Sequence, residues 1–304
     1  MIYWGALQNG EQLLLGRPEE AVLSYDREAP ADQLKAVFPA DRVWPELAEV
    51  LAYREGQGVF RGIVDEQNTR LTGSGLSVEL VCRSREALLL DNEAEPGTIR
   101  NPSAEALSRR LLEPLGLRPG AGLQPAAGSL FIEKGTSCWT VLADFCRDYL
   151  GTKPYVDFEG VVHWEEPQPR RLELGQVVSA EIARLPCRRL SALWKQGCLG
   201  GYDTLYSAGE AGIPRRRYLS MENAARPREL LEESARESFR LTVTCAGSWW
   251  PARGLASVTV PLAGRYENCP VRRAVYSRDK NGERTRLVLE KGGAADVADP
   301  EIGR

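Results

Sequence analysis

Two stretches rich in strand-forming residues, 59–66 and 76–84, constrain the fold of this chain most, because a glycine-containing turn at 73–75 lies between them. Branched and aliphatic residues in runs of this length are typical of β-strands, and glycines permit a reversal of the backbone. The apolar segment 87–91 follows directly. We therefore predict two strands of a small β-barrel that run into a segment closing it.

Further strands are predicted on the amino-terminal side of this pair. Residues 21–25 and 33–38 are rich in β-formers and are separated by turn residues, so we expect them to pair. A strand at 50–54 reverses at 55–58 into the strand that begins at Val59. About six strands with frequent turns in the first 90 residues indicate a sandwich or a barrel.

The character of the sequence changes after residue 100. Asn101 is a good helix cap, and apolar residues then recur at helical spacing as far as Gly116. A second cap at Thr136 or Ser137 begins another apolar helix face, which ends at Gly151, where a left-handed C-cap is expected. A hairpin signal follows at 155–164, so we predict an α+β region.

A third region combines a helix with more strands. Residues 227–238 are expected to be helical, 239–245 alternate strongly, and 272–276 and 284–289 face each other across a turn at 279–282. We predict a mixed, mainly β fold with two small β-barrel domains and an intervening α+β domain. The expected segments are 1–95 for the first barrel, 96–168 for the α+β domain, 169–291 for the second barrel with its helix, and 292–304 for a mobile tail.

Composition excludes several classes of protein. A formal charge of −3 argues against a dedicated nucleic-acid binder, which usually has a strongly basic domain. The seven cysteines include no CxxC pair, so we expect reduced, mostly buried thiols and neither a disulfide framework nor a zinc site. No apolar run approaches the roughly 20 residues that span a bilayer, and no secretory signal is visible at the amino terminus. We therefore expect folding in a cytoplasm.

The order of these elements resembles that of phage tail baseplate hub proteins, the Mu-like and myophage central hubs of the late control D-like family. Besides the first-barrel strands, the resemblance rests on the helix-and-hairpin segment 135–162, the basic-aromatic segment 214–219, the strand and turn 243–247 and the closing hairpin 281–289. It covers about 290 residues. An extra carboxy-terminal domain found in some larger hubs is expected to be absent.

The resemblance implies a structural, non-enzymatic protein that forms a homotrimer. Two barrels per subunit would make a six-unit ring that adapts a hexameric tail tube to a trimeric central spike. Its implied partners are the tail tube and central spike proteins, with tape measure and baseplate wedge proteins as further candidates. No cofactor, no membrane and no specific nucleic acid are expected. The implied location is the tail baseplate of the virion, assembled in the bacterial host cytoplasm.

We predict no catalytic, cofactor-binding or metal-binding residue. His163 is the only histidine, so a general base here would lack the convergent groups that a reacting site needs, and a hairpin or packing role is favoured. Barrel edge strands are natural docking sites, and we expect Val37→Pro at such an edge to abolish ring formation. The predicted interface residues are Val37, Phe60, Arg215, Arg216, Arg217, Trp249 and Trp250.

Two of these clusters have other interpretations. The three arginines, expected on a loop, could grip phosphate or nucleic acid, but inter-subunit pairing suits arginine better. Trp249 and Trp250 could form a carbohydrate-binding platform, although one core ring and one interface ring is the favoured arrangement. The alternative function is therefore a tail-associated cell-wall hydrolase or carbohydrate-binding module, with carboxylates such as Glu165 and Glu166 lining a groove. A non-viral β-rich scaffold is the third possibility.

Overall fold

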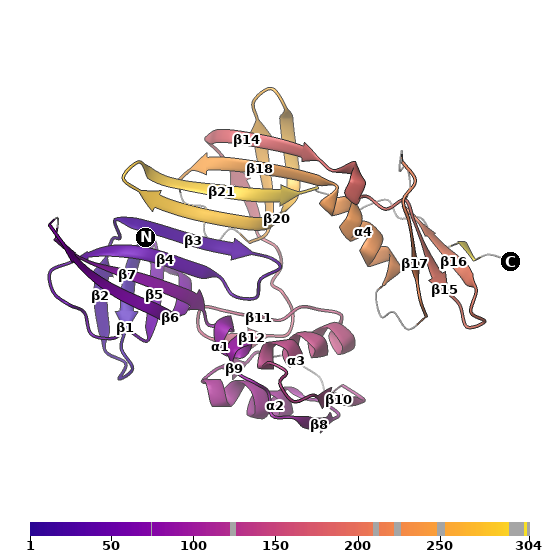
Figure 1. Ribbon diagram of the computed structural model, residues 1–304, viewed down its shortest axis with the longest axis horizontal. Coiled ribbons are helices and arrows are strands. Elements are labelled where there is room, and N and C mark those ends of the chain that lie inside the picture. Colours follow the sequence, from indigo (N-terminus) through magenta and orange to yellow (C-terminus); the bar gives the residue numbers. More distant parts are fainter. Residues whose placement is uncertain are drawn as a thin grey trace. The chain divides into compact units, whose positions relative to one another are not determined.

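The computed structural model of the chain describes residues 1–73, 75–121, 126–208, 213–221, 226–247, 253–291 and 301–302. Strands account for 52% and helices for 16% of the residues, which confirms the mainly β class. The chain divides into two compact units (Figure 1). The first holds Met1–Gln168 and the hairpin tip Val275–Glu283, and the second holds the other described residues after Gln168. The four predicted segments remain a prediction.

Seven antiparallel strands form the main sheet of the first unit, in the order β3, β4, β7, β6, β5, β1, β2. This path does not return to its start, so the described strands form no closed barrel. The predicted pairings of 21–25 with 33–38 and of 50–54 with the strand after it are confirmed. The bounds are β1 Ile2–Ala6, β2 Gln12–Gly16, β3 Glu20–Asp26, β4 Gln33–Ala40, β5 Glu49–Arg54, β6 Gln57–Thr72 and β7 Gly75–Ser84.

Alternation along β7 directs one face of this sheet toward the core. Val78, Leu80 and Cys82 are all fully buried, while the residues between them are only partly covered. Gly62 on β6 lies where a Cβ would collide with the carbonyl oxygen of Arg83 and with the ring of Phe60. Glycine is therefore required for β6 and β7 to approach at this point.

Helices and short strands make up the rest of the first unit. Ser137 caps α3 by accepting a hydrogen bond from the Thr140 amide at 3.1 Å, and Gly151 ends the helical segment at φ +68°, both as predicted. The bounds are α1 Glu86–Asp91, β8 Gly97–Arg100, α2 Ala104–Leu107, a π-helical turn Ser108–Leu112, a 3-10 turn Glu113–Leu115, β9 Arg118–Pro119, β10 Ser129–Ile132, α3 Cys138–Phe145, a second π-helical turn Cys146–Leu150, β11 Tyr155–Val156 and β12 Val161–His163.

The predicted start of the first helix is wrong by two residues. Ser103 caps α2 through the Ala106 amide at 3.3 Å. Asn101 instead adopts a positive φ of 46°, and its side-chain oxygen accepts a hydrogen bond from the Gly128 amide. Asparagine tolerates this left-handed backbone better than most residues, so it serves a turn here and caps no helix.

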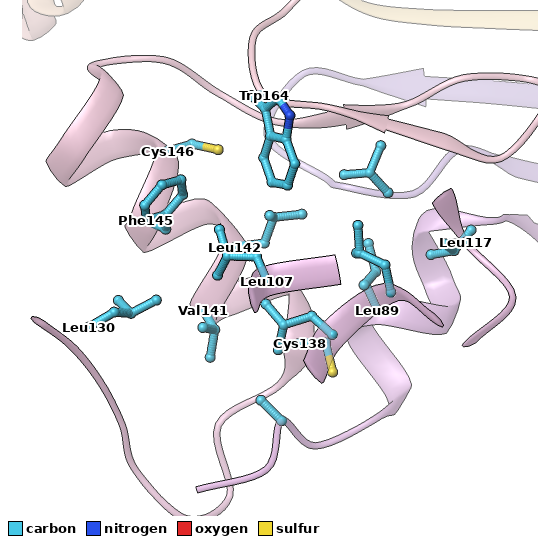
Figure 2. Close-up of a cluster of buried hydrophobic side chains, with 14 of the residues drawn as sticks. Leu89, Leu107, Leu117, Leu130, Cys138, Val141, Leu142, Phe145, Cys146 and Trp164 are labelled. Carbon is cyan, nitrogen blue, oxygen red and sulfur yellow. The ribbon is translucent and has the colours of Figure 1, made fainter. Parts of the chain in front are cut away.

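A single apolar cluster holds these helices together (Figure 2). Leu142 and Phe145 of α3 are fully buried. The Phe145 ring stacks on Tyr149 at 5.2 Å and meets Trp164 edge-on at 6.4 Å between centroids. The Trp164 indole donates a 3.0 Å hydrogen bond to the carbonyl of Gly120, so its one polar atom is satisfied inside the cluster.

A second antiparallel arrangement forms most of the second unit. β14 pairs with β18 and β18 with β21, while β13 runs parallel to β19, which pairs with β20. The predicted strand at 239–245 and the closing hairpin are confirmed. The bounds are β13 Arg171–Leu174, β14 Val177–Arg184, a 3-10 turn Pro186–Arg188, β18 Phe239–Ala246, β19 Leu255–Val260, β20 Gly264–Asp279 and β21 Gly282–Glu290.

A small four-stranded sheet and α4 complete the second unit (Figure 1). Leu231 of α4 packs on Leu193 and Leu219 of the sheet, and all three are buried. The helix predicted at 227–238 is thereby confirmed. The bounds are β15 Ala192–Gln196, β16 Tyr202–Ser207, β17 Arg216–Leu219, α4 Pro227–Glu237 and β22 Glu301–Ile302. Apart from β22, the tail predicted at 292–304 lies outside the described residues.

Candidate assembly interface

The strand β14 has a core-facing row of side chains that no described element covers. Ala180 and Ile182 lie directly opposite Val243 and Leu241 of β18, and directly opposed residues of an antiparallel pair share one face of the sheet. Val243 and Leu241 are fully buried, whereas Ile182 is 37% exposed and Ala180 is exposed as well. The apolar face of this sheet therefore continues uncovered at its last strand.

The far half of β6 repeats this pattern in the first unit. Thr69 lies opposite the fully buried Val78 of β7, and Leu71 lies opposite Leu76. Thr69 is nonetheless exposed, and Leu71 is 79% exposed. β5 pairs with β6 only as far as Ile63, so residues 68–71 pair on one side alone in the described part of the chain.

Both features are typical of surfaces that become buried in an assembly. A sheet edge offers unpaired backbone groups to another strand, and exposed apolar rows add an energetic reason to cover it. Sequence patterns alone did not predict a role for these residues. The alternation of Val178, Ala180 and Ile182 was the available signal for β14, whereas the polar far half of β6 carries no hydropathy signal at all.

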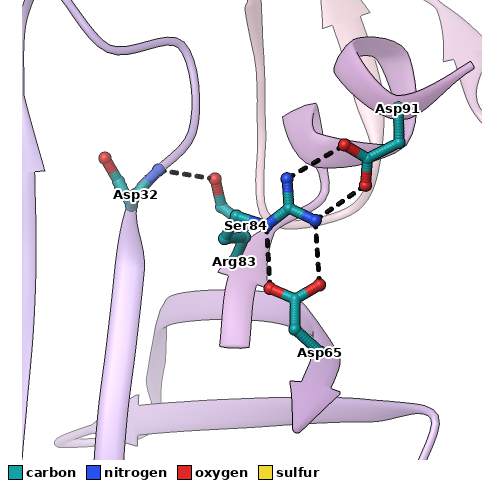
Figure 3. Close-up of polar contacts among 5 residues, drawn as sticks. All are labelled: Asp32, Asp65, Arg83, Ser84 and Asp91. Atoms are coloured by element: carbon teal, nitrogen blue, oxygen red, sulfur yellow. Dashed lines mark hydrogen bonds and ion pairs between the residues drawn. The ribbon is translucent and has the colours of Figure 1, made fainter. Parts of the chain in front are cut away.

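An ion-pair cluster fixes the root of this β6 segment (Figure 3). Arg83 of β7 donates hydrogen bonds of 2.7 and 2.9 Å to Asp65 of β6, and of 3.0 and 2.7 Å to Asp91 of α1. Hydrogen bonds to both carboxylates raise the pKa of Arg83. Beside it, Ser84 and Asp32 exchange two hydrogen bonds of 2.9 and 2.8 Å. The cluster is structural, because charges of opposite sign satisfy each other there.

The predicted arginine cluster lies on a strand, not on the expected loop. Arg216 and Arg217 belong to β17, which runs parallel to β15 at the end of the small sheet, and Arg215 precedes it. Arg216 and Arg217 are exposed, and the neighbouring Tyr218 meets the Tyr202 ring edge-on at 5.1 Å. The structure brings basic and aromatic side chains together here.

Two other predicted interface residues occupy unexpected places. Val37 lies on β4, which pairs with β3 on one side and β7 on the other, so the strand is not an edge. Phe60 is only 3% exposed, and its ring packs at Gly62, so its side chain offers no surface to a partner. The predicted Trp249 and Trp250 lie outside the described residues.

His163 takes the packing role that was favoured. Its Nε2 lies 2.8 Å from Asp157 Oδ2, and its ring stacks on Tyr155 at 4.6 Å. The other oxygen of Asp157 accepts a hydrogen bond from the Val161 amide, which closes the turn of this hairpin. The Asp157 carboxylate therefore joins His163 to the turn of the hairpin. Glu165 and Glu166, the carboxylates named for the alternative function, follow His163 in the chain and are both exposed.

Other site types find little support in the described part of the chain. Five of the seven cysteines are buried there and none forms a disulfide. Burial raises the pKa of Cys82 and of Cys146 to about 12, which keeps these thiols protonated and unreactive. Within the described ranges, no three histidine, cysteine, aspartate or glutamate side chains gather to hold a metal ion. None of the described helices combines the length and apolar character needed to cross a membrane.

No family model matches the chain, and no curated protein matches its sequence. Solved structures do match it. The tail protein from Neisseria meningitidis MC58 is 18% identical, with a TM-score of 0.71 over 96% of this chain and 98% of that chain. The 43 kDa tail protein of prophage MuSo2 from Shewanella oneidensis is 16% identical, with a TM-score of 0.73 over 95% and 96%.

A third match comes from a secretion machine. The Escherichia coli c3393 protein, a component of the type VI secretion system with structural similarity to the bacteriophage T4 tail proteins gp27 and gp5, is 9% identical, with a TM-score of 0.54 over 91% of this chain and 75% of that chain. At such identities the likeness concerns the fold. The chain therefore has, over almost its whole length, the fold of the Neisseria and Shewanella tail proteins.

Proposed function

We propose that this protein is a structural baseplate hub of a phage tail or of a related contractile injection particle. The observation that carries the proposal is the match to two solved tail proteins over at least 95% of this chain and of each of theirs. Because each match extends over almost the full length of both chains, the likeness covers all of their domains and not one common domain alone. The likeness to a type VI secretion component extends the proposal to injection particles outside phages.

The proposed assembly is a homotrimeric ring. A tube of sixfold rings must end on a threefold spike, and a subunit with two similar β units can present six similar surfaces while the ring remains threefold. The uncovered rows of β14 and β6 support self-assembly, because a lone chain leaves apolar side chains such as Leu71 in water. The proposed partners are the tail tube protein above and the central spike protein below.

The basic strand β17 is a candidate contact with these partners. Arg216, Arg217 and Tyr218 are exposed on it, and arginine with tyrosine is the pairing enriched at the centres of protein interfaces. Exposed guanidinium groups would pair with carboxylates of the tube or spike. Arg215, which is half-buried, would support this strand from its base.

The role is non-enzymatic in this proposal. The one histidine is engaged with Asp157 and Tyr155 in a hairpin, and the described acidic residues form no metal-binding group. A scaffold needs geometry and contact surface, which are the features that the described residues provide.

Incorporation into particles tests the proposal directly. The chain would be produced with an epitope tag from the genome that encodes it, and tail particles would be purified and labelled with gold-conjugated antibody. We expect label at one end of each tail, in three copies per particle by quantitative mass spectrometry. Purified tails that contain no tagged chain would overturn the proposed function.

A further inference from the structure

We infer that β14 of one copy of this chain pairs antiparallel with residues 68–71 of β6 in a second copy. The inference rests on the proposed function, since it names the contact that would close the ring. The two uncovered rows, the directions of the backbone amides and the charges that would face each other all support this pairing.

Each row offers two residues that can face the other row, Ala180 and Ile182 on β14 and Thr69 and Leu71 on β6. Val178, Ala180 and Ile182 are small or β-branched, and Val178 is 60% exposed at a bulge in the strand. Thr69 and Leu71 continue the core face of the other sheet in the same way. Joined edge to edge, the two sheets would form one continuous apolar face, in which Ile182 and Leu71 lose contact with water.

The backbone amides of β14 point the right way for this pairing. The Leu185 amide, one residue past the strand, donates a 2.7 Å hydrogen bond to the Ser238 carbonyl on the β18 side. Amide directions alternate along a strand, so those of Ile182 and Ala180 point away from β18. They are available to a strand of another chain.

The far half of β6 has the complementary arrangement. Its hairpin with β7 ends on the pair Thr72 and Gly75, and the closing pair of a two-residue hairpin exchanges backbone hydrogen bonds. The amides of Leu71 and Thr69 therefore point away from β7. Nearer the root, the side-chain oxygen of Gln67 accepts a 3.0 Å hydrogen bond from the Leu47 amide. The segment around Leu47 therefore lies beside Gln67, and the residues after Gln67 are the ones left for a second chain.

One antiparallel register satisfies the rows and the amides together. It sets Ile182 opposite Thr69 and Ala180 opposite Leu71, with outward amides facing each other at both pairs. On the other face of the joined sheet the same register sets Glu181 opposite Arg70. Like charges are avoided at that position, and opposite charges directly across a ladder stabilise it.

The charges favour this direction of the strands. Arg70 is 65% exposed and lies 3.8 Å from Glu79 in its own chain, so a second carboxylate can join it from outside. An antiparallel β14 directs Arg184 toward the root of the β6 segment, where Asp65 and Glu66 lie. A parallel β14 would direct Arg184 toward the glycines of the hairpin turn, and residues 71–75 include no aspartate or glutamate.

The partner is a second copy because each chain carries one strand of each kind. Such a contact is heterologous, so every chain uses its β14 on one neighbour and its β6 on the other. Successive contacts close into a ring when the rotation permits, and three copies are the number that the proposed hub requires.

Site-specific cross-linking tests the register. Ala183 and Asn68 form a non-hydrogen-bonded pair in it, with Cα atoms about 4.5 Å apart, within the span of a disulfide. The variants Ala183→Cys and Asn68→Cys would be made separately, each with the exposed Cys187 and Cys198 changed to serine. Mixed and oxidised, they should give a covalent dimer of twice 33.6 kDa on a non-reducing gel.

Two controls make the result specific. Each variant oxidised alone should give no dimer band, because a heterologous junction then holds only one of the two cysteines. Asn68→Cys mixed with Ile182→Cys should also fail, because the two side chains would lie on opposite faces. A dimer band from either single variant, or none from the Ala183 and Asn68 mixture, would overturn the proposed pairing.

Solution mass gives an independent measurement. Ile182→Glu and Leu71→Glu should each reduce the particle from three chains to one in light scattering, since a charge enters the joined apolar face. Leu199→Glu is the matched control, because Leu199 is 98% exposed and lies on neither strand. If the Ile182→Glu variant still has the mass of three chains in light scattering, the inference is wrong.

The two proposals can fail separately. If purified tails contain the chain and incorporate the Ile182→Glu variant normally, the proposed strand pairing is wrong and the proposed hub function is supported. If the Ala183 to Asn68 cross-link forms but purified tails contain no copy of the chain, the strand pairing is supported and the hub function is wrong.

Discussion

Arg83 of β7 donates two hydrogen bonds to Asp65 of β6, from Nε at 2.7 Å and from Nη2 at 2.9 Å. The β6 register shifts between Val64 and Glu66, so Asp65 is the extra residue of a bulge. The bulge turns this carboxylate toward Arg83 and re-aims the strand beyond it. The ion pair thus holds the root of the β6 segment that we assign to the subunit contact.

Asp65→Ala should therefore lower the free energy of unfolding of the first unit by about 1–2 kcal/mol, because it removes a two-point charged hydrogen bond that is only partly screened. Urea denaturation followed by circular dichroism measures this loss. Asp148→Ala is the control, since the Asp148 pair with Arg147 is largely exposed and should contribute about 0.5 kcal/mol or less. Equal losses in both variants would contradict a special role for Asp65.

Hydrogen bonds from Arg83 lower the pKa of the Asp91 carboxyl below its ordinary value of 3.8. A depressed folded-state pKa means that the pair stabilises the protein above the unfolded pKa and that this contribution is lost as pH falls through the folded pKa. Asp91→Asn should cost about 0.5–1 kcal/mol at neutral pH, because the pair is partly exposed. Unfolding measured across the acid range should show the two proteins converging as the pH falls below the ordinary carboxyl pKa of 3.8. A constant difference would contradict the ion-pair explanation.

Gly62→Ala should destabilise the first unit by about 1–3 kcal/mol, because the added Cβ meets the Arg83 carbonyl oxygen and the Phe60 ring with no room to move. Gly73→Ala is the matched control on the same hairpin, where a Cβ would meet nothing within 4 Å. Thermal unfolding of the two variants should show a large shift for the first and almost none for the second. The reverse order would mean that β6 and β7 approach differently.

Phe145→Ala should cost about 3–5 kcal/mol by opening a cavity in the cluster shown in Figure 2. Phe131 provides the comparison, because its ring is 68% exposed and Phe131→Ala should stay within about 0.5 kcal/mol of the parent. Both values come from chemical denaturation. Similar values for the two phenylalanines would contradict the assignment of α3 to the core.

Much of the fold was predictable where alternation or capping has a local cause. The antiparallel pairing of β3 with β4, the cap at Ser137 and the helix α4 all follow from residues within one turn or one strand of each other. The helix start at Asn101 was wrong because asparagine suits both a cap and a left-handed turn. Nothing in the nearest residues distinguishes the two uses.

The candidate interface was harder to predict for a physical reason. β6 was expected to span 59–66 but spans Gln57–Thr72, because the polar run 65–70 interrupts the apolar alternation that predicts a strand. For the same reason, the hydropathy of the sequence does not reveal that the far half of β6 is a sheet edge. Val37 was assigned to an edge strand, whereas its strand β4 pairs with β3 on one side and β7 on the other. Val37→Pro would therefore disrupt the fold itself.

Negative-stain electron microscopy of the purified protein, alone and mixed with its candidate spike protein, tests the central claim most directly. We expect class averages of threefold rings with a central opening, in one or both samples. Isolated single particles in both samples, at every concentration tried, would contradict the assignment of this chain as a tail hub.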